Sequence, residues 1–339
     1  MIFEGGEAVK MNRKIKKSSV WFLVLSLILS GTILFDVSAA RGVETERKCS
    51  ATFEVGGDLA GDFAELSKMS IPIKLYKVAE INETGSYTAV KGYEALDFKD
   101  VTSETTAKEW EEKAQKAEKI IEDEKKAPTA EGIIQNGKGK TNDLSVGMYL
   151  VAAETVRSPE YEYKFTSYLL SLPNNYYSTT GNDDWVYDVT TGLKPSQEVR
   201  FGNLVIDKTV TSFNETLGNA TFVFQIEGKK DGEQIYSDVV SAVFDAAGTK
   251  SILVEKIPAG TEVTVTEIYS GASYELTSEP SQTVIIKALE DGETDGVHVT
   301  FTNSYDNRLN GGASVVNHFA NEEGVWTVEQ QSDSVNAAE

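Results

Sequence analysis

Residues 204–210 read Leu-Val-Ile-Asp-Lys-Thr-Val, a run whose alternation and β-branched content predict a β-strand. The same pattern recurs at residues 263–269, Val-Thr-Val-Thr-Glu-Ile-Tyr, and at residues 299–305, Val-Thr-Phe-Thr-Asn-Ser-Tyr. Each run carries one polar side chain in its interior: Lys208, Glu267 and Asn303. Because the runs lie near the first, middle and last strands of one module, we expect these side chains to meet in its core.

Burial of Lys208 and Glu267 would leave two charges away from water, and such groups tend to become neutral. We expect burial to lower the pKa of Lys208 toward a nucleophilic free amine and to raise the pKa of Glu267. Protonated Glu267 can then hydrogen-bond the Asn303 side-chain carbonyl, polarise it for attack, and pass a proton to the leaving ammonia. The product is an amide bond between Lys208 and Asn303. The alternative is that all three are ordinary solvent-facing strand residues.

The residues around this trio resemble a known family. Ile257-Pro258-Ala259-Gly260-Thr261 leads into the strand of Glu267, and Phe301-Thr302-Asn303-Ser304-Tyr305 closes the module. Residues 203–306 resemble the intramolecular isopeptide domains of Gram-positive surface proteins, the CnaB-like modules of adhesins and pilins. The resemblance implies an immunoglobulin-like β-sandwich with an isopeptide bond from Lys208 to Asn303 and with Glu267 as the proton shuttle.

The N-terminal residues have the order of a secretory signal peptide. Basic residues within 13–17 precede an apolar run at 20–35, and small residues follow at 37–40. We therefore predict a signal peptide over residues 1–40, cleaved after Ala39 or Ala40, and a secreted or cell-surface protein. The alternative is an uncleaved membrane anchor, for which the apolar run is short.

The chain is strongly acidic, with a formal net charge of −21, which becomes about −23 without residues 1–40. Such a surface repels nucleic acid, so nucleic-acid binding is excluded. Cys49 is the only cysteine, which excludes an internal disulfide. The two histidines, His298 and His318, lack sequence partners that would predict a catalytic triad or a metal site. We expect no cofactor and no enzymatic turnover beyond self-cross-linking.

Short strand-like runs occur on both sides of one helix-like segment. In the first half, strands are predicted at residues 50–55, 71–81, 147–154, 163–172 and 185–190. Residues 103–126 are rich in Ala, Glu and Lys with an apolar stripe, which predicts an amphipathic helix that ends before Pro128.

This pattern predicts a mainly β fold of two tandem immunoglobulin-like (CnaB-type) β-sandwich modules, the first with an inserted helix. The first module, similar to a pilin N-terminal domain, is expected over residues 50–195. A loop containing Lys194-Pro195 is expected to lead into the second module at residue 203. Residues 307–339 form a polar tail that is expected to be disordered or weakly attached.

The segment 185–194, Trp-Val-Tyr-Asp-Val-Thr-Thr-Gly-Leu-Lys, resembles the pilin motif of sortase-assembled backbone pilins. Trp185, Val189 and Lys194 hold the motif positions, although Thr191-Gly192-Leu193 stands where the family has Val-Tyr-Pro. The resemblance implies that a sortase joins Lys194 to the next subunit, so the expected partners are a sortase and other pilin subunits. Alternatively, Lys194 is one of many surface lysines.

A cross-link in the first module is a further hypothesis. Glu154 lies in residues 148–155, which resemble the E-box of these pilins, and it is the candidate acid. The candidate nucleophiles are Lys74 and Lys77. No asparagine lies in a clear closing strand there, so Asp188 is the alternative acyl partner. The sequence leaves open whether this bond forms.

These observations predict a secreted, pilin-like structural or adhesive surface protein of a Gram-positive bacterium. The residues up to Glu339 contain no Leu-Pro-any-Thr-Gly sorting signal with an apolar helix and basic tail, so we expect no wall anchoring by the usual route. The alternative function is a soluble secreted binding module for a host protein or glycan. Its candidate surface is a group of aromatic residues: Tyr161, Tyr163, Tyr176 and Tyr177. The alternative, which the residue type favours, is that these tyrosines are packed or capping strand residues.

Overall fold

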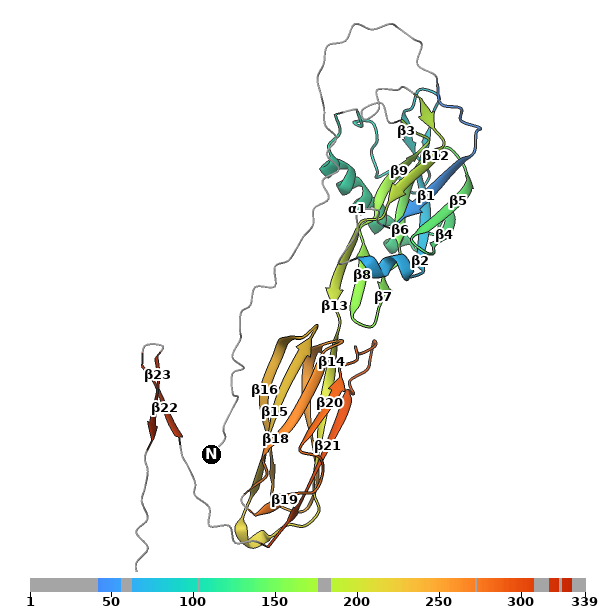
Figure 1. Ribbon diagram of the computed structural model, residues 1–339. Coiled ribbons are helices and arrows are strands. Elements are labelled where there is room, and N and C mark those ends of the chain that lie inside the picture. The colour runs from blue at the N-terminus through green and yellow to red at the C-terminus, as the bar shows by residue number, and fades with distance from the viewer. Residues whose placement is uncertain are drawn as a thin grey trace, which may run out of the picture.

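The computed structural model describes residues 42–55, 63–102, 104–175, 184–271 and 273–307, and the backbone of 317–322 and 325–330. Two β modules follow one another along the chain (Figure 1). This arrangement confirms the predicted fold class. The predicted signal peptide lies outside the described residues. Within the described part, no helix has the length and apolar character needed to cross a membrane.

The first module is a sandwich of two main sheets. Their strands are β1 (Cys49–Glu54), β2 (Ile71–Ile81), β3 (Tyr87–Ala89), β4 (Ala130–Ile134), β5 (Lys138–Leu144), β6 (Gly147–Ala153), β9 (Tyr168–Leu172) and β12 (Asp188–Gly192). One sheet has the order β3-β2-β6-β9, with β4 also paired to β2, and the other has the order β12-β1-β5. Buried side chains from both sheets, among them Phe53, Leu75 and Tyr149, form the core between them.

The inserted helix, α1 (Ala107–Glu124), covers the outer face of the larger sheet. Ala114 and Ala117 are buried there beside Tyr76 and Leu150 of the sheet. The helix begins four residues later than the predicted position 103, because Thr106 caps it through a reciprocal capping box with Glu109. The part of the larger sheet beneath α1 is therefore buried on both faces, which explains why the neighbouring residues Leu75 and Tyr76 of β2 are both buried.

Residues 163–172, predicted as one strand, are divided between two sheets. They belong to β8 (Tyr161–Phe165) and to β9, and β8 pairs with β7 (Val156–Arg157) and β13 (Pro195–Val199). The predicted loop at Lys194-Pro195 is shorter than expected: Lys194 lies between β12 and β13, but Pro195 already begins a paired strand. A proline at the first position of a strand removes no internal ladder hydrogen bond, so the sequence did not forbid this pairing.

The first module also contains several shorter elements. They are the 3-10 helix η1 (Ala64–Lys68) and the paired strands β10 (Asn174–Asn175) and β11 (Trp185–Val186). The polar strand β5 pairs with β1 along its length although its sequence has no apolar alternation. Such strands cannot be recognised from hydrophobic periodicity.

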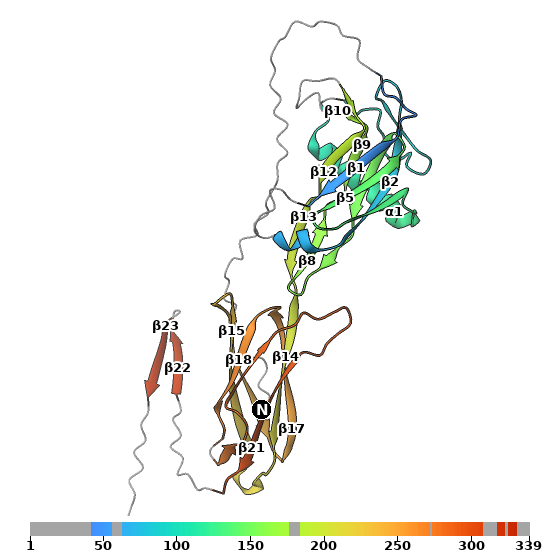
Figure 2. The ribbon, with the colours of Figure 1, turned by 45° about the vertical axis from the view of Figure 1, so that its right-hand side comes forward.

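The second module is a sandwich of two four-stranded sheets. Its elements are β14 (Phe201–Val210), η2 (Glu215–Leu217), β15 (Ala220–Lys230), β16 (Glu233–Phe244), β17 (Gly248–Pro258), β18 (Glu262–Tyr269), β19 (Tyr274–Leu276), β20 (Ser281–Ile285) and β21 (Val297–Tyr305). The sheet orders are β17-β14-β21-β19 and β16-β15-β18-β20. Figure 2 shows β14 and β17 on one side of the module and β15 and β18 on the other.

The polar tail contains regular structure at residues 317–322 and 325–330, so of the two alternatives, disorder and weak attachment, disorder is wrong there. Its strands β22 (Asn317–Glu322) and β23 (Val325–Gln330) pair antiparallel. The two-residue separation of these strands is typical of a hairpin, a signal that the polar composition of the tail obscured. His318 lies in β22.

Candidate functional site

Strand register brings the polar trio of the second module together. β14 and β21 are parallel neighbours in which Lys208 lies opposite Phe301, and Asn303 follows two residues later on the same face. Glu267 lies on β18 of the facing sheet, where Val263, Val265 and Glu267 alternate inward. The three side chains therefore enter the core from the two layers of the sandwich.

The contacts within the trio are direct. Lys208 Nζ donates a hydrogen bond to Glu267 Oε2 at 2.7 Å and contacts Asn303 Oδ1. Asn303 Nδ2 donates to Glu267 Oε1 at 2.8 Å. The side chains of Lys208 and Glu267 are each 0% exposed, and Asn303 is also 0% exposed. One buried carboxyl group thus touches both the amine and the amide nitrogen.

Aromatic rings form the wall of this site. Lys208 Nζ lies 4.4 Å from the centre of the Phe222 ring and 5.8 Å from that of Phe224. Phe224 in turn packs on Phe301, with their ring centres 5.1 Å apart. Desolvation by this surrounding lowers the pKa of Lys208, while the hydrogen bond and charge of Glu267 act in the opposite direction. Lys208 is therefore closer to a neutral nucleophile than a surface lysine is.

The orientation of Asn303 differs from the expected one. We expected Glu267 to hydrogen-bond the side-chain carbonyl of Asn303, whereas Glu267 accepts a hydrogen bond from the Asn303 amide nitrogen. The carbonyl oxygen faces Lys208 instead. This arrangement puts Glu267 Oε2 beside the attacking group and Oε1 beside the leaving group, which is the geometry required for moving a proton from one to the other.

The cross-link candidates of the first module do not come together in one group. Lys74 Nζ forms an ion pair with Glu154 Oε1 at 2.6 Å, with side chains 38% and 45% exposed. Lys77 Nζ bonds to Glu80 at 2.6 Å and to Ser145 at 3.1 Å. Asp188, with a side chain 75% exposed, accepts from Ser50. Lys74 and Glu154 contact each other but are solvated, Lys77 is largely buried but bonds to Glu80 and Ser145, and Asp188 bonds to Ser50. The geometry therefore gives no support to the hypothesis of a cross-link in the first module.

The pilin-motif residues lie at the end of the first module. Lys194 is exposed between β12 and β13, and its Nζ lies 5.5 Å from the ring centre of Tyr168. Val189 is buried in the core, and Trp185 is half-buried against it. No sequence pattern marks Tyr168 as a neighbour of Lys194, because only the fold brings β9 beside this junction.

Among the described residues, the remaining candidates do not form a binding or catalytic site. Tyr163 of the candidate aromatic group is fully buried and donates to Glu65, so it is a packed strand residue and not part of an exposed patch. Tyr161 is half-buried, and Tyr176 and Tyr177 lie outside the described residues. His298 is partly exposed between Asp207 and Asp295, at 2.6 and 3.0 Å, and these hydrogen bonds raise its pKa.

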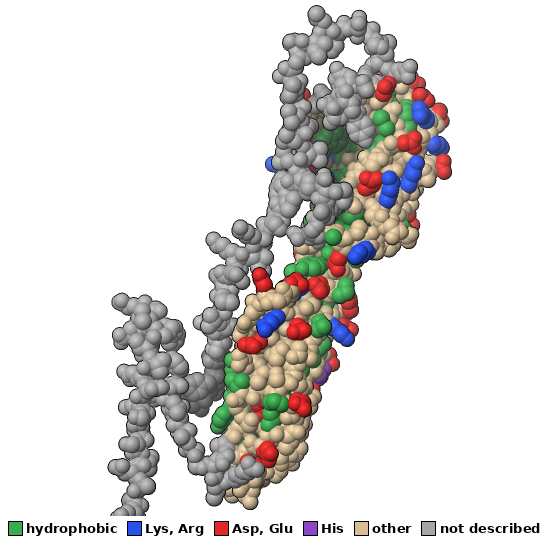
Figure 3. Space-filling model, in the orientation of Figure 1, with side chains coloured by type: hydrophobic (Ala, Val, Ile, Leu, Met, Phe, Trp, Pro, Cys, Tyr) green, Lys and Arg blue, Asp and Glu red, His purple; other side chains and the backbone are tan. Residues whose placement is uncertain are grey.

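No metal-binding group of three or more His, Cys, Asp or Glu residues occurs in the part of the chain that the structure describes. Acidic side chains are spread over the visible face of both modules (Figure 3).

Comparison with known proteins gives a family match for the second module. The family described as a domain of unknown function, DUF5979, matches residues 204–306. A search of curated proteins finds no match.

Pilins are among the solved structures to which the chain is similar. A Streptococcal ancillary pilin is 12% identical, with 83% of this chain and 80% of that chain covered and a TM-score of 0.26. The minor pilin GBS52 of Streptococcus agalactiae is 15% identical, with 76% and 96% covered and a TM-score of 0.21. The major pilin SpaD from Corynebacterium diphtheriae is 11% identical, with 78% and 99% covered and a TM-score of 0.27. At this level of similarity, any statement on function depends on the side chains described above.

Proposed function

We propose that the second module forms an isopeptide bond between Lys208 and Asn303 and that the chain is a cross-linked structural protein of the cell surface. The observation that carries this proposal is the fully buried contact among Lys208, Glu267 and Asn303. A charged lysine in an aromatic core is costly, and reaction to a neutral amide removes that cost.

The reaction begins with transfer of one proton from the Lys208 ammonium to Glu267 along their hydrogen bond. The free amine attacks Asn303 Cγ, forming the new C–N bond, and Glu267 donates its proton to Nδ2 as the C–Nδ2 bond breaks. Ammonia leaves, and the proton released from Nζ returns to Glu267. Neither an oxidant nor a cofactor is consumed. The step occurs once per chain, so the protein acts on itself and is not an enzyme.

Intact mass spectrometry tests the bond directly. The chain expressed without residues 1–40 is expected to be lighter than its sequence mass by one ammonia, about 17 Da, because amide formation releases the Asn303 amide nitrogen. Lys208→Ala should have its full sequence mass. Lys250→Ala is the matched control, since Lys250 lies opposite Lys208 in β17 but has a side chain that is 50% exposed.

A wild-type chain at its full sequence mass would sink the cross-link proposal. A loss of ammonia that persists in Lys208→Ala would show that another residue supplies the amine. Tandem mass spectrometry of a proteolytic digest then identifies the two joined peptides, which should contain Lys208 and Asn303.

We further propose that the chain is a pilin-like subunit whose Lys194 accepts an acyl group from a sortase, with other subunits as partners. The support is the exposed position of Lys194 near the end of the first module, in a motif whose Val189 is buried in the core. An acceptor lysine must reach an acyl-enzyme, so it needs the exposure that Lys208 lacks.

Transfer to Lys194 can be measured with a pilin-type sortase and a Leu-Pro-any-Thr-Gly peptide. Peptide mapping is expected to find the Leu-Pro-any-Thr group on Lys194, and Lys194→Arg should lose this adduct. Lys138→Arg, at a surface lysine 64% exposed, is the control and should keep it. An adduct distributed over many surface lysines would contradict the assignment of Lys194 as a specific acceptor.

A further inference from the structure

The two modules are joined without a free linker. Arg200 is the single residue between β13 of the first module and β14 of the second. Its backbone N–H donates to Glu160 O at 2.9 Å, and its carbonyl accepts from Ala259 N at 2.9 Å. Because Glu160 belongs to the β7–β8 turn and Ala259 to the β17–β18 loop, the connecting residue is hydrogen-bonded to both modules.

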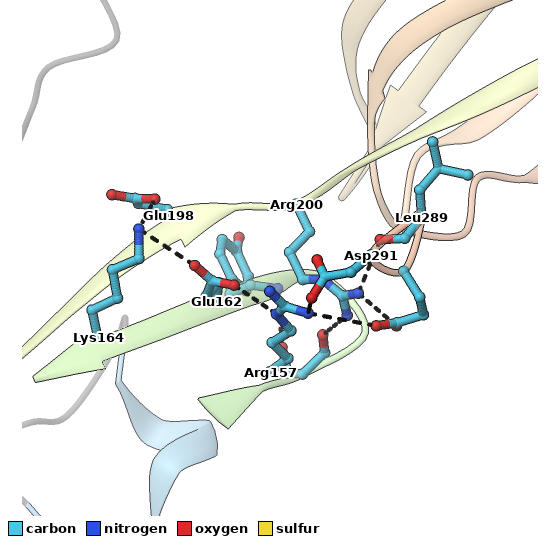
Figure 4. Close-up of polar contacts among 10 residues, drawn as sticks. Arg157, Glu162, Lys164, Glu198, Arg200, Leu289 and Asp291 are labelled. Carbon is cyan, nitrogen blue, oxygen red and sulfur yellow. Dashed lines mark hydrogen bonds and ion pairs between the residues drawn. The ribbon is translucent and has the colours of Figure 1, made fainter. Parts of the chain in front are cut away.

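The side chain of Arg200 repeats this bridge. Its Nη1 donates to Ser158 O at 2.7 Å in the first module, and its Nη2 donates to Glu290 Oε1 at 2.6 Å and Leu289 O at 3.3 Å in the second (Figure 4). The side chain is only 11% exposed. A guanidinium has several donors in one rigid plane, so a single group can hold two carbonyls and a carboxylate on opposite sides of the joint.

Two further cations cross the joint in opposite directions. Lys230 of the second module pairs with Glu160 at 2.8 Å and also donates to Ala259 O at 3.1 Å. Arg157 of the first module pairs with Asp291 at 3.0 Å, as Figure 4 shows. The Lys230 side chain is 16% exposed, whereas the side chains of Arg157 and Asp291 are 37% and 87% exposed. Solvent and salt therefore weaken the Arg157 pair most.

We propose that Arg200 and Lys230 hold the two modules together as one rigid body. Residues 157–162, which include the β7–β8 turn, supply the contacts of the first module. Domains linked by flexible segments reorient freely unless their interface holds them. Here the connecting residue, Arg200, is hydrogen-bonded to both modules through its backbone and its side chain. Lys230 of the second module in addition pairs with a carboxylate of the first module. The inference does not depend on the isopeptide bond.

Pulsed electron spin resonance measures this rigidity as a distance distribution between two spin labels. Suitable sites are Lys119→Cys on α1, where the side chain is 74% exposed, and Glu233→Cys at the exposed start of β16. Cys49 is buried, and burial raises the pKa of its thiol to about 11, so the native cysteine should stay unlabelled. The doubly labelled full chain, without residues 1–40, is expected to give a single narrow distribution.

In the Arg200→Ala/Lys230→Ala variant, the distribution should broaden at least about twofold, because only backbone contacts and solvated pairs then hold the joint. Lys164→Ala is the matched control and should leave the width unchanged, because Lys164 pairs with Glu162 and Glu198, which both belong to the first module. Two results would overturn the proposal: a broad distribution in the wild-type background, or an unchanged width in the double variant. Circular dichroism of the double variant verifies that both modules remain folded.

Discussion

Glu267→Gln is expected to slow formation of the Lys208–Asn303 bond by roughly 10²- to 10⁴-fold, the usual contribution of a positioned acid-base group. Glutamine keeps the size of the side chain and can still hydrogen-bond Asn303. It cannot take a proton from Lys208 or give one to the leaving nitrogen. In the wild-type protein, Glu267 contacts both groups, at 2.7 Å from Lys208 Nζ and 2.8 Å from Asn303 Nδ2.

The measurement is the intact mass of each protein at increasing times after its cell-free synthesis. The fraction that has lost ammonia gives the rate of bond formation. Glu262→Gln is the matched control, because Glu262 lies on the same strand, β18, with an exposed side chain. A normal rate in Glu267→Gln would remove Glu267 from the mechanism while leaving the bond itself in place.

The trio was predictable because strand periodicity is a strong constraint. Once residues 204–210 and 299–305 are strands, Ile206, Lys208 and Val210 must share one face, and so must Val299, Phe301 and Asn303. The apolar members of each set fix that face toward the core. The polar members are carried inward with them.

The sequence could not show the direction of the Asn303 amide or the rings over Lys208. Phe222 and Phe224 lie on β15, and their approach to Lys208 depends on the packing of one sheet on the other. Contacts of this kind are set by tertiary structure, and no spacing in the sequence encodes them.

The module joint was missed for a different reason. Arg157, Arg200 and Lys230 are charged residues in or beside turns, where the default expectation is solvation. Their partners are largely backbone carbonyls and scattered carboxylates, which have no recognisable pattern. The break of residues 163–172 at Thr166-Ser167 was missed because both halves carry similar alternation, and only their different sheets distinguish them.

The second large effect expected is on stability. The bond closes a loop between residues 95 positions apart. In the chain-entropy treatment of cross-links, a loop of that length stabilises the folded state by about 4–5 kcal/mol. For a module of this size, that difference corresponds to roughly 15–30 °C in the unfolding midpoint.

Removing only one member of the trio would mix this effect with the penalty for an unpaired buried charge. The Lys208→Met/Glu267→Gln variant avoids that problem, since methionine fills the space of the lysine chain and glutamine can still bond to Asn303. Scanning calorimetry should find the unfolding midpoint of the second module lowered by roughly 15–30 °C and that of the first module unchanged. Lys250→Met, near the beginning of β17 where the lysine side chain is 50% exposed, should shift neither. If the double variant lowers the free energy of unfolding of the second module by less than about 1 kcal/mol, the bond does little to restrict the unfolded chain. The stabilising role assigned to the bond would then have to be abandoned.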